Sequence, residues 1–139
     1  MKKIFLSFIM ILFTIPSLTM AYEQIEIKCP NPNKLLQATE DDQEKLMNAL
    51  HELIPKVYGT SQEYKEWRIE VIKPMRELTG ENHDYYEMAK NFCGEEVANL
   101  SWFVRLRFPK LLPAQSASLG EIYVVQDKQH NWIVWFQYH

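Results

Sequence analysis

The sequence is poor in the features that identify most enzymes and metal proteins. It holds four glycines, two cysteines and four histidines, with no G-x-S-x-G nucleophile motif and no H-x-x-x-H pair. It contains no internal repeat, and after residue 15 no apolar run approaches the roughly 20 residues that a membrane-spanning helix needs. The sequence therefore contains no motif that assigns a catalytic function, and it predicts neither a metal ion nor a cofactor.

The N-terminus carries the clearest pattern in the chain. Two lysines precede an apolar run over residues 4–15, a Pro-Ser pair follows, and Thr19 and Ala21 place small residues before a cleavage point. This order is typical of a secretory signal peptide. We predict that residues 1–21 are cleaved, that the mature protein begins at Tyr22, and that it is exported to the cell envelope, the periplasm or the medium of a bacterium.

A second interpretation of the N-terminus stays open. If residues 4–15 remain uncleaved, they anchor the chain, and the protein becomes a membrane-tethered accessory protein. Lipid attachment is not predicted, because it needs a cysteine at the cleavage point and the first cysteine is Cys29.

Residues 22–139 form one predicted domain with a negative net charge. The 15 basic residues of the chain include the two lysines of the signal, so 13 remain against 18 acidic residues, a net charge of −5. Phosphate contacts supply most of the affinity of nucleic-acid-binding proteins, so this domain is not expected to bind nucleic acid. Anionic lipid surfaces are disfavoured for the same reason. A protein, a peptide or a small molecule remains as the partner.

Cys29 and Cys93 are predicted to form a disulfide. An isolated pair of cysteines in an exported protein is most often oxidised. The bond would close a loop of about 65 residues, which the chain-entropy model values at about 4 kcal/mol. The other interpretation is a catalytic cysteine, but Cys93 is followed by Gly94, and no histidine stands at a spacing that marks it as a partner.

Helical patterns fill the first half of the exported domain. Thr39 and the three acidic residues after it predict a helix N-terminus, and Gly59 predicts a helix end. The capping box Thr60-Ser61-Gln62-Glu63 predicts the start of a second helix, which Pro74 should bend. The apolar spacing thus predicts three helices, over residues 40–58, 60–80 and 82–92.

The second half alternates as strands do. Strands are predicted over residues 97–108, 120–126 and 132–138, with a hairpin turn at 127–131 and a short edge strand at 22–28. The last strand, WIVWFQY, is apolar on both faces, which predicts an interior position or a pocket on one side. The order of elements predicts an α+β domain with its helices packed on one face of a curved antiparallel meander.

This pattern resembles a known superfold. Helices followed by a meander that ends in Gly120, Tyr123-Val124-Val125 and Trp132-Ile133-Val134-Trp135 look like small secreted bacterial domains of the nuclear-transport-factor-2-like or cystatin-like α+β superfold. The resemblance covers residues 40–139 and is topological. It implies a sheet that wraps a long helix and leaves room for a cone-shaped pocket. Such folds usually have four or more strands, whereas three are predicted within residues 40–139. The superfold hosts enzymes and binding modules, so it implies no single function.

An aromatic set is the candidate binding site. Six aromatic residues are expected to converge where the third helix meets the sheet: Tyr85, Tyr86, Trp102, Tyr123, Trp132 and Trp135. The simpler interpretation is that they form the core. The other interpretation is that they line a pocket, rimmed by Arg105 and Arg107, that binds an apolar or anionic small ligand or a peptide. It predicts five ligand-binding residues: Tyr86, Trp102, Arg105, Tyr123 and Trp135.

Candidate acid–base groups are few and scattered. Glu95 and Glu96 are adjacent, and His83 stands at the start of the third predicted helix. Any of them would serve catalysis only at the floor of a pocket. The leading prediction is therefore a secreted, disulfide-linked, non-catalytic binding or interaction domain. A small secreted hydrolase that uses Glu95, Glu96 or His83 is the alternative.

Overall fold

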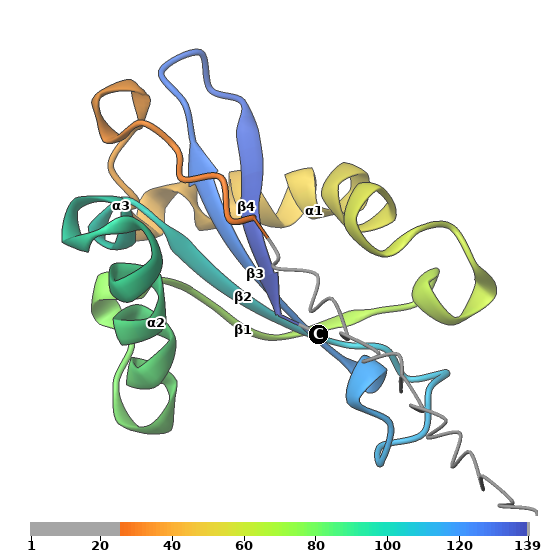
Figure 1. Ribbon diagram of the computed structural model, residues 1–139. Helices are drawn as coiled ribbons and strands as arrows, with labels where there is room; N and C mark the ends of the chain where they lie inside the picture. The colour runs from red at the N-terminus through yellow and green to blue at the C-terminus, as the bar shows by residue number, and fades with distance from the viewer. Residues whose placement is uncertain (1–25, 139) are drawn as a thin grey trace, which may run out of the picture.

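The structure, a computed structural model, describes residues 26–138 (Figure 1). The predicted signal peptide and its cleavage point lie outside the described residues. Helices and strands follow in the order α1 (Gln43–Tyr58), β1 (Arg68–Pro74), α2 (His83–Cys93), α3 (Glu95–Asn99), β2 (Trp102–Arg107), β3 (Leu119–Gln126) and β4 (Trp132–Tyr138). The four strands form one antiparallel sheet in the order β1-β2-β3-β4. The predicted α+β class and the antiparallel meander are confirmed.

Helix α1 forms where the apolar spacing predicts it. Its buried side chains recur at helical intervals and are Leu46, Leu50, Leu53 and Ile54. A short 3₁₀ turn, Glu40–Asp42, precedes the helix, and the Thr39 hydroxyl donates a hydrogen bond to Asp42 Oδ2 at 2.8 Å. Gly59 ends the helix with φ of +88°, a conformation that glycine adopts without strain. The predicted helix end is confirmed.

The second predicted helix is wrong, because residues 68–74 form strand β1. The expected capping box yields only a 3₁₀ turn over Gln62–Tyr64, without a side-chain cap. Strand β1 pairs with β2 along its length, and its register shifts between Ile69 and Val71. Cross-strand pairing and burial against β2 therefore outweigh the helical spacing of the local sequence. This strand supplies the fourth strand that the sequence pattern lacked.

Smaller differences affect the other elements. The third predicted helix is confirmed as α2, whereas the predicted strand over 97–108 begins later, because Glu95–Asn99 forms the short helix α3. The two C-terminal strands are confirmed as β3 and β4. The edge strand predicted over 22–28 is not formed by residues 26–28, and the rest of it lies outside the described residues.

Helices cover both faces of the sheet, not one face as expected. On the first face, here called the α1 face, α1 packs on Trp102, Val104, Leu106, Ile122 and Val124. On the opposite α2 face, α2 and α3 pack on Phe103, Tyr123, Val125 and Trp135. Because successive strand residues point to opposite faces, β2 and β3 are covered on both sides, and each contains an apolar stretch, over residues 102–104 and 122–125.

A bulge in β4 explains why its sequence is apolar on both sides. The register between β3 and β4 shifts between Tyr123 and Val124, so Trp135 is an extra residue on β4. As a result Trp132 and Val134 contact the α1 face, whereas the adjacent residues Trp135 and Phe136 both belong to the α2 face.

Candidate functional site

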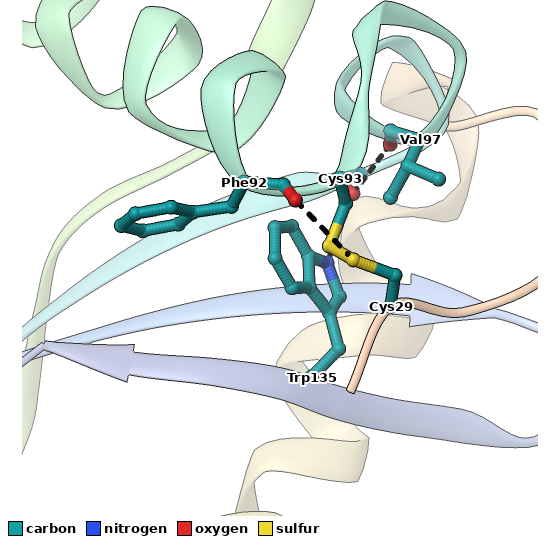
Figure 2. Close-up of a disulfide and its surroundings, with 6 residues drawn as sticks. Cys29, Phe92, Cys93, Val97 and Trp135 are labelled. Atoms are coloured by element: carbon teal, nitrogen blue, oxygen red, sulfur yellow. Dashed lines mark hydrogen bonds between the residues drawn. A yellow bond between two sulfur atoms is a disulfide. The ribbon is translucent and has the colours of Figure 1, made fainter. Parts of the chain in front are cut away.

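The disulfide fixes the N-terminal arm, residues 26–36, across the α2 face. Cys29 and Cys93 are bonded, with their Cα atoms 5.4 Å apart, so the predicted pairing is confirmed (Figure 2). The other end of the arm is held by backbone hydrogen bonds. The Leu36 N–H donates to the carbonyl of Gln126 at 2.8 Å, and the Lys128 N–H donates to the carbonyl of Lys34 at 3.0 Å. The arm is thus anchored at two points.

A groove lies between this arm and the β3–β4 hairpin. Its volume is about 410 Å³, within the range of small-molecule sites. Its apolar side chains include Leu35 and Trp135, which are 7% and 9% exposed, and Ile133, which is 41% exposed. We call it the arm groove; it is lined by Lys28, Cys29, Pro30, Asn31, Lys34, Leu35, Asp127, Gln129, Ile133, Val134 and Trp135.

Trp135 joins the arm groove to the protein interior. Figure 2 shows its indole beside the disulfide, between the arm and α2. The indole Nε1–H donates a hydrogen bond to Ser101 Oγ at 3.0 Å, and the Ser101 hydroxyl donates to the Val97 carbonyl at 2.7 Å. Ser101 is fully buried, so this chain of hydrogen bonds fixes the indole orientation in a dry environment.

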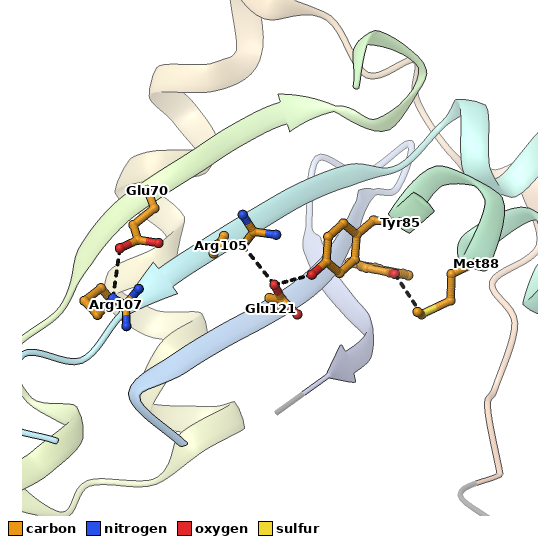
Figure 3. A network of polar contacts seen from close by, with 7 residues as sticks. Glu70, Tyr85, Met88, Arg105, Arg107 and Glu121 are labelled. Carbon is orange, nitrogen blue, oxygen red and sulfur yellow. Dashed lines mark hydrogen bonds and ion pairs between the residues drawn. The ribbon is translucent and has the colours of Figure 1, made fainter. Parts of the chain in front are cut away.

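A second polar cluster lies further along the same face (Figure 3). Glu121 Oε1 accepts a hydrogen bond from Arg105 Nε at 2.8 Å and another from the Tyr85 hydroxyl at 2.6 Å. The Arg105 guanidinium also lies over the rings of Tyr85 and Phe103, at 5.1 and 5.4 Å from their centroids. Next to this cluster, Arg107 Nε pairs with Glu70 Oε1 at 2.9 Å.

Charge and burial in this cluster stabilise its present protonation state. Burial raises the pKa of Tyr85, and the hydrogen bond to Glu121 raises it further. Burial opposes the charge of Arg105, but the hydrogen bonds with Glu121 and Tyr85 outweigh it and raise the pKa of Arg105. The cluster therefore holds a protonated tyrosine and a charged arginine around one buried carboxylate, and it ties α2 to β2 and β3.

The five predicted ligand-binding residues do not share one site. Trp102 lies on the α1 face, where its ring packs against Trp132, so the expected convergence of the aromatic set is wrong for these two residues. The other four lie on the α2 face, but they are separated: Tyr86 donates to Asn99 Oδ1, Tyr123 donates to Met88 Sδ, Arg105 pairs with Glu121, and Trp135 lines the arm groove. Their role in binding stays a prediction.

Two further hollows have similar or larger volumes but more polar walls. One, of about 650 Å³, lies between α1 and the segment before β1, where His51 packs on Trp67 with ring centroids 5.0 Å apart. The other, of about 420 Å³, follows the outer edge of β1. Solvent-exposed charged side chains, among them Lys65 and Lys73, line these hollows.

The candidate acid–base groups lie apart from the arm groove. Glu95 and Glu96 are exposed on α3, and His83 lies 3.5 Å from Glu87 on the surface of α2. Within residues 26–138, no three His, Cys, Asp or Glu side chains gather in a way that would hold a metal ion. In the same part of the chain, no helix has the length and apolar character needed to cross a membrane.

Sequence reasoning singled out Trp135 but missed the rest of the arm groove. Lys28, Lys34, Leu35 and Ile133 carry no local signal, because the arm and the hairpin are about 100 residues apart in sequence. The predicted Cys29–Cys93 pairing was the available signal, because it places the arm beside the C-terminal end of α2.

No protein-family model matches the chain, and neither a curated protein nor a solved structure matches it significantly. The chemistry of the described side chains is therefore the basis for assigning a function.

Proposed function

We propose that this protein is an exported, disulfide-linked binding domain that takes its ligand in the arm groove and performs no catalysis. One observation carries the proposal: the groove combines an exposed apolar side chain, Ile133, with walls that are anchored before any ligand arrives. A pre-formed apolar hollow with polar groups at its rim is the usual form of a small-molecule site. Because the disulfide and the backbone bonds of the arm hold the wall, little ordering entropy opposes binding.

The polar groups of the α2 face support a binding role over an enzymatic one. The buried carboxylate of Glu121 is paired with Arg105 and hydrogen-bonded by Tyr85, both through Oε1, and it does not line the arm groove. A general acid or base must reach the substrate from a pocket. Glu95, Glu96 and His83 do not line the arm groove.

Export is the second element of the proposal. It rests on the signal-peptide pattern of residues 1–21, and the Cys29–Cys93 disulfide is consistent with an oxidising compartment. N-terminal sequencing of the exported protein should give Tyr22 as the first residue. An N-terminus at Met1 in a membrane fraction would support the tethered accessory protein instead.

A relation to the nuclear-transport-factor-2-like or cystatin-like superfold is the third element. The four-stranded antiparallel sheet packed on the long helix α1 supports it. This relation concerns the fold alone, and the binding proposal does not depend on it.

Chemical-shift mapping tests the binding proposal directly. A panel of apolar small molecules and short extended peptides is titrated into the disulfide-bonded, ¹⁵N-labelled protein. We expect shifts at residues 28–35 and 127–135, including the indole N–H of Trp135. The change Ile133→Asp should abolish them.

Leu112→Asp is the matched control, because Leu112 is an exposed leucine outside the groove, 69% exposed. It should leave binding unchanged. Shifts confined to the His51–Trp67 hollow, or shifts that Ile133→Asp does not alter, would contradict the proposal.

A further inference from the structure

The charges around the arm groove are unevenly distributed. Lys28 and Lys34 are both exposed at the groove, on the arm side. Among residues 26–138, neither forms an ion pair within 4.0 Å, so both ammonium groups are available to a ligand in the groove. Two unpaired cations thus stand at one wall of an apolar groove, in a chain whose net charge is negative.

The single acidic residue in the groove wall, Asp127, forms no ion pair with either lysine among residues 26–138. The Asp127 carboxylate is turned toward the hairpin, where it accepts hydrogen bonds from the Gln129 N–H at 2.9 Å and the Asn131 N–H at 2.8 Å. The Asn131 side chain donates a third, at 3.0 Å. These bonds from Asn131 and Gln129 lower the pKa of Asp127, so it stays ionised as part of the turn.

The positions of the two lysines are constrained at the backbone. Lys28 is adjacent to the disulfide-bonded Cys29, and the Lys34 carbonyl accepts a hydrogen bond from the Lys128 N–H. Between them, the 3₁₀ turn Pro32–Lys34 is capped by the Asn31 side chain, which accepts from the Asn33 N–H at 3.0 Å. Their ammonium groups therefore start from fixed points on the groove wall while the flexible stems adjust to a ligand.

We infer that the arm groove binds a small amphiphilic anion, with its apolar body on Leu35, Ile133 and Trp135 and its carboxylate or phosphate between Lys28 and Lys34. This inference rests on the proposed binding function and adds the chemical class of the ligand. The apolar surface supplies affinity through burial, and the two lysines supply orientation and selectivity. A neutral ligand of the same shape gains affinity from apolar burial but none from the charges of the two lysines.

Decanoate and decanol are the probes, both kept below the concentration at which decanoate forms micelles. Each is titrated into the disulfide-bonded protein and followed by chemical shifts at residues 28–35 and 127–135. Decanoate should bind roughly tenfold more tightly than decanol, since each exposed lysine contributes about threefold. Octanoate should bind about 15-fold more weakly than decanoate, because each buried CH₂ changes affinity about fourfold. Titration of decyl phosphate shows whether a phosphate group binds between the two lysines as well as a carboxylate does.

Three single variants separate charge from fold. Lys28→Gln and Lys34→Gln should each weaken decanoate about threefold and leave decanol unchanged, and added salt should act in the same direction. Lys73→Gln is the matched control, because Lys73 is an exposed lysine on β1 that lines a different hollow. It should change neither affinity.

Each possible failure has a distinct meaning. Equal affinities for decanoate and decanol in the groove would overturn the anion inference and leave the proposed binding function intact. Decanoate binding that is insensitive to both lysine variants would do the same. Binding that maps to the His51–Trp67 hollow and persists in Ile133→Asp would overturn the site itself. Absence of decanoate shifts in a groove that accepts peptides would show that the ligand class is wrong.

Discussion

The two faces of the sheet are held together by different physical means. On the α1 face, a cluster of aliphatic and aromatic side chains packs against one long helix. On the α2 face, the disulfide joins α2 to the N-terminal arm. The shorter helices are joined to the sheet by the Arg105–Glu121–Tyr85 cluster and by the Trp135–Ser101–Val97 hydrogen bonds.

The comparison explains where the groove lies. The 16-residue helix α1 buries four large aliphatic side chains, whereas α2 buries only Ala89 and the five-residue α3 buries Val97 and Ala98. Covalent and polar contacts therefore add to apolar packing on the α2 face. The disulfide and the backbone hydrogen bonds to β3 and the hairpin also hold the arm that forms one wall of the groove. The hollow beside α1 lies next to His51 and Trp67, whereas the arm groove lies between the arm and the β3–β4 hairpin.

Removing the disulfide should have the largest effect, and it should act on the α2 face. The double change Cys29→Ser with Cys93→Ser should lower the free energy of unfolding by about 4 kcal/mol, because the bond closes a long loop. Urea denaturation measures the loss. Hydrogen exchange should accelerate in the arm and α2 more than in α1. Equal acceleration on both faces would remove the distinction between them.

Breaking the buried ion pair is the next largest change. Glu121→Gln leaves Arg105 without its carboxylate and should cost about 3 kcal/mol, the low end for such pairs because the Arg105 side chain is 21% exposed. The double variant Arg105→Met with Glu121→Leu is the control, since replacing both charges by apolar groups costs far less. If the double variant loses as much free energy of unfolding as Arg105→Met and Glu121→Leu lose when made separately and summed, the two side chains are not coupled.

On the α1 face, Gly120→Ala should destabilise by overpacking. A Cβ atom at Gly120 would lie 2.5 Å from the Tyr58 hydroxyl oxygen, 2.7 Å from Tyr58 Cζ and 2.9 Å from a ring carbon of Phe108. These contacts should cost about 2 kcal/mol in thermal or urea unfolding. In a Tyr58→Phe background the nearest atom is gone, and the cost should fall. If Gly120→Ala lowers the free energy of unfolding equally in the parent protein and in Tyr58→Phe, the Tyr58 hydroxyl is not the source of the overpacking.

Tyr58→Phe alone should give the smallest effect, a gain. Among residues 26–138, the Tyr58 hydroxyl is the one buried side-chain polar atom without a hydrogen-bond partner, so its removal should stabilise by about 1 kcal/mol. Burial raises the pKa of Tyr58 above its ordinary value of 10.0. Above that pH the unfolded chain loses the proton that the folded protein keeps, so stability falls as pH rises.

The Tyr58→Phe variant should therefore lose stability less steeply than the parent protein above pH 10.0. Urea denaturation on both sides of that pH measures the difference. Tyr123, whose pKa burial also raises, continues to contribute in both proteins. If the stability of both proteins falls with the same slope above pH 10.0, burial does not keep the Tyr58 hydroxyl protonated in the folded state.

Elements with strong local signals could be predicted from the sequence. Helix α1 has four buried side chains at helical spacing and a glycine at its end, and both features act within a few residues. The Asp127–Asn131 turn and the two strands beside it were predicted for the same reason. The pairing of Cys29 with Cys93 followed from their being the two cysteines of the chain.

Tertiary structure decided the rest. Residues 68–74 have apolar spacing that suits a helix, yet they pair with β2, whose partner residues lie from 28 positions (Pro74 with Trp102) to 39 positions (Arg68 with Arg107) later. The alternation of Ile69 and Val71 with charged residues was a weak local sign of this strand. The arm groove depended on still longer contacts, between residues 28–35 and 127–135. Local sequence encodes helix periodicity and turns, whereas strand pairing, the faces that helices cover and the walls of a groove are set by contacts whose partners are distant in sequence.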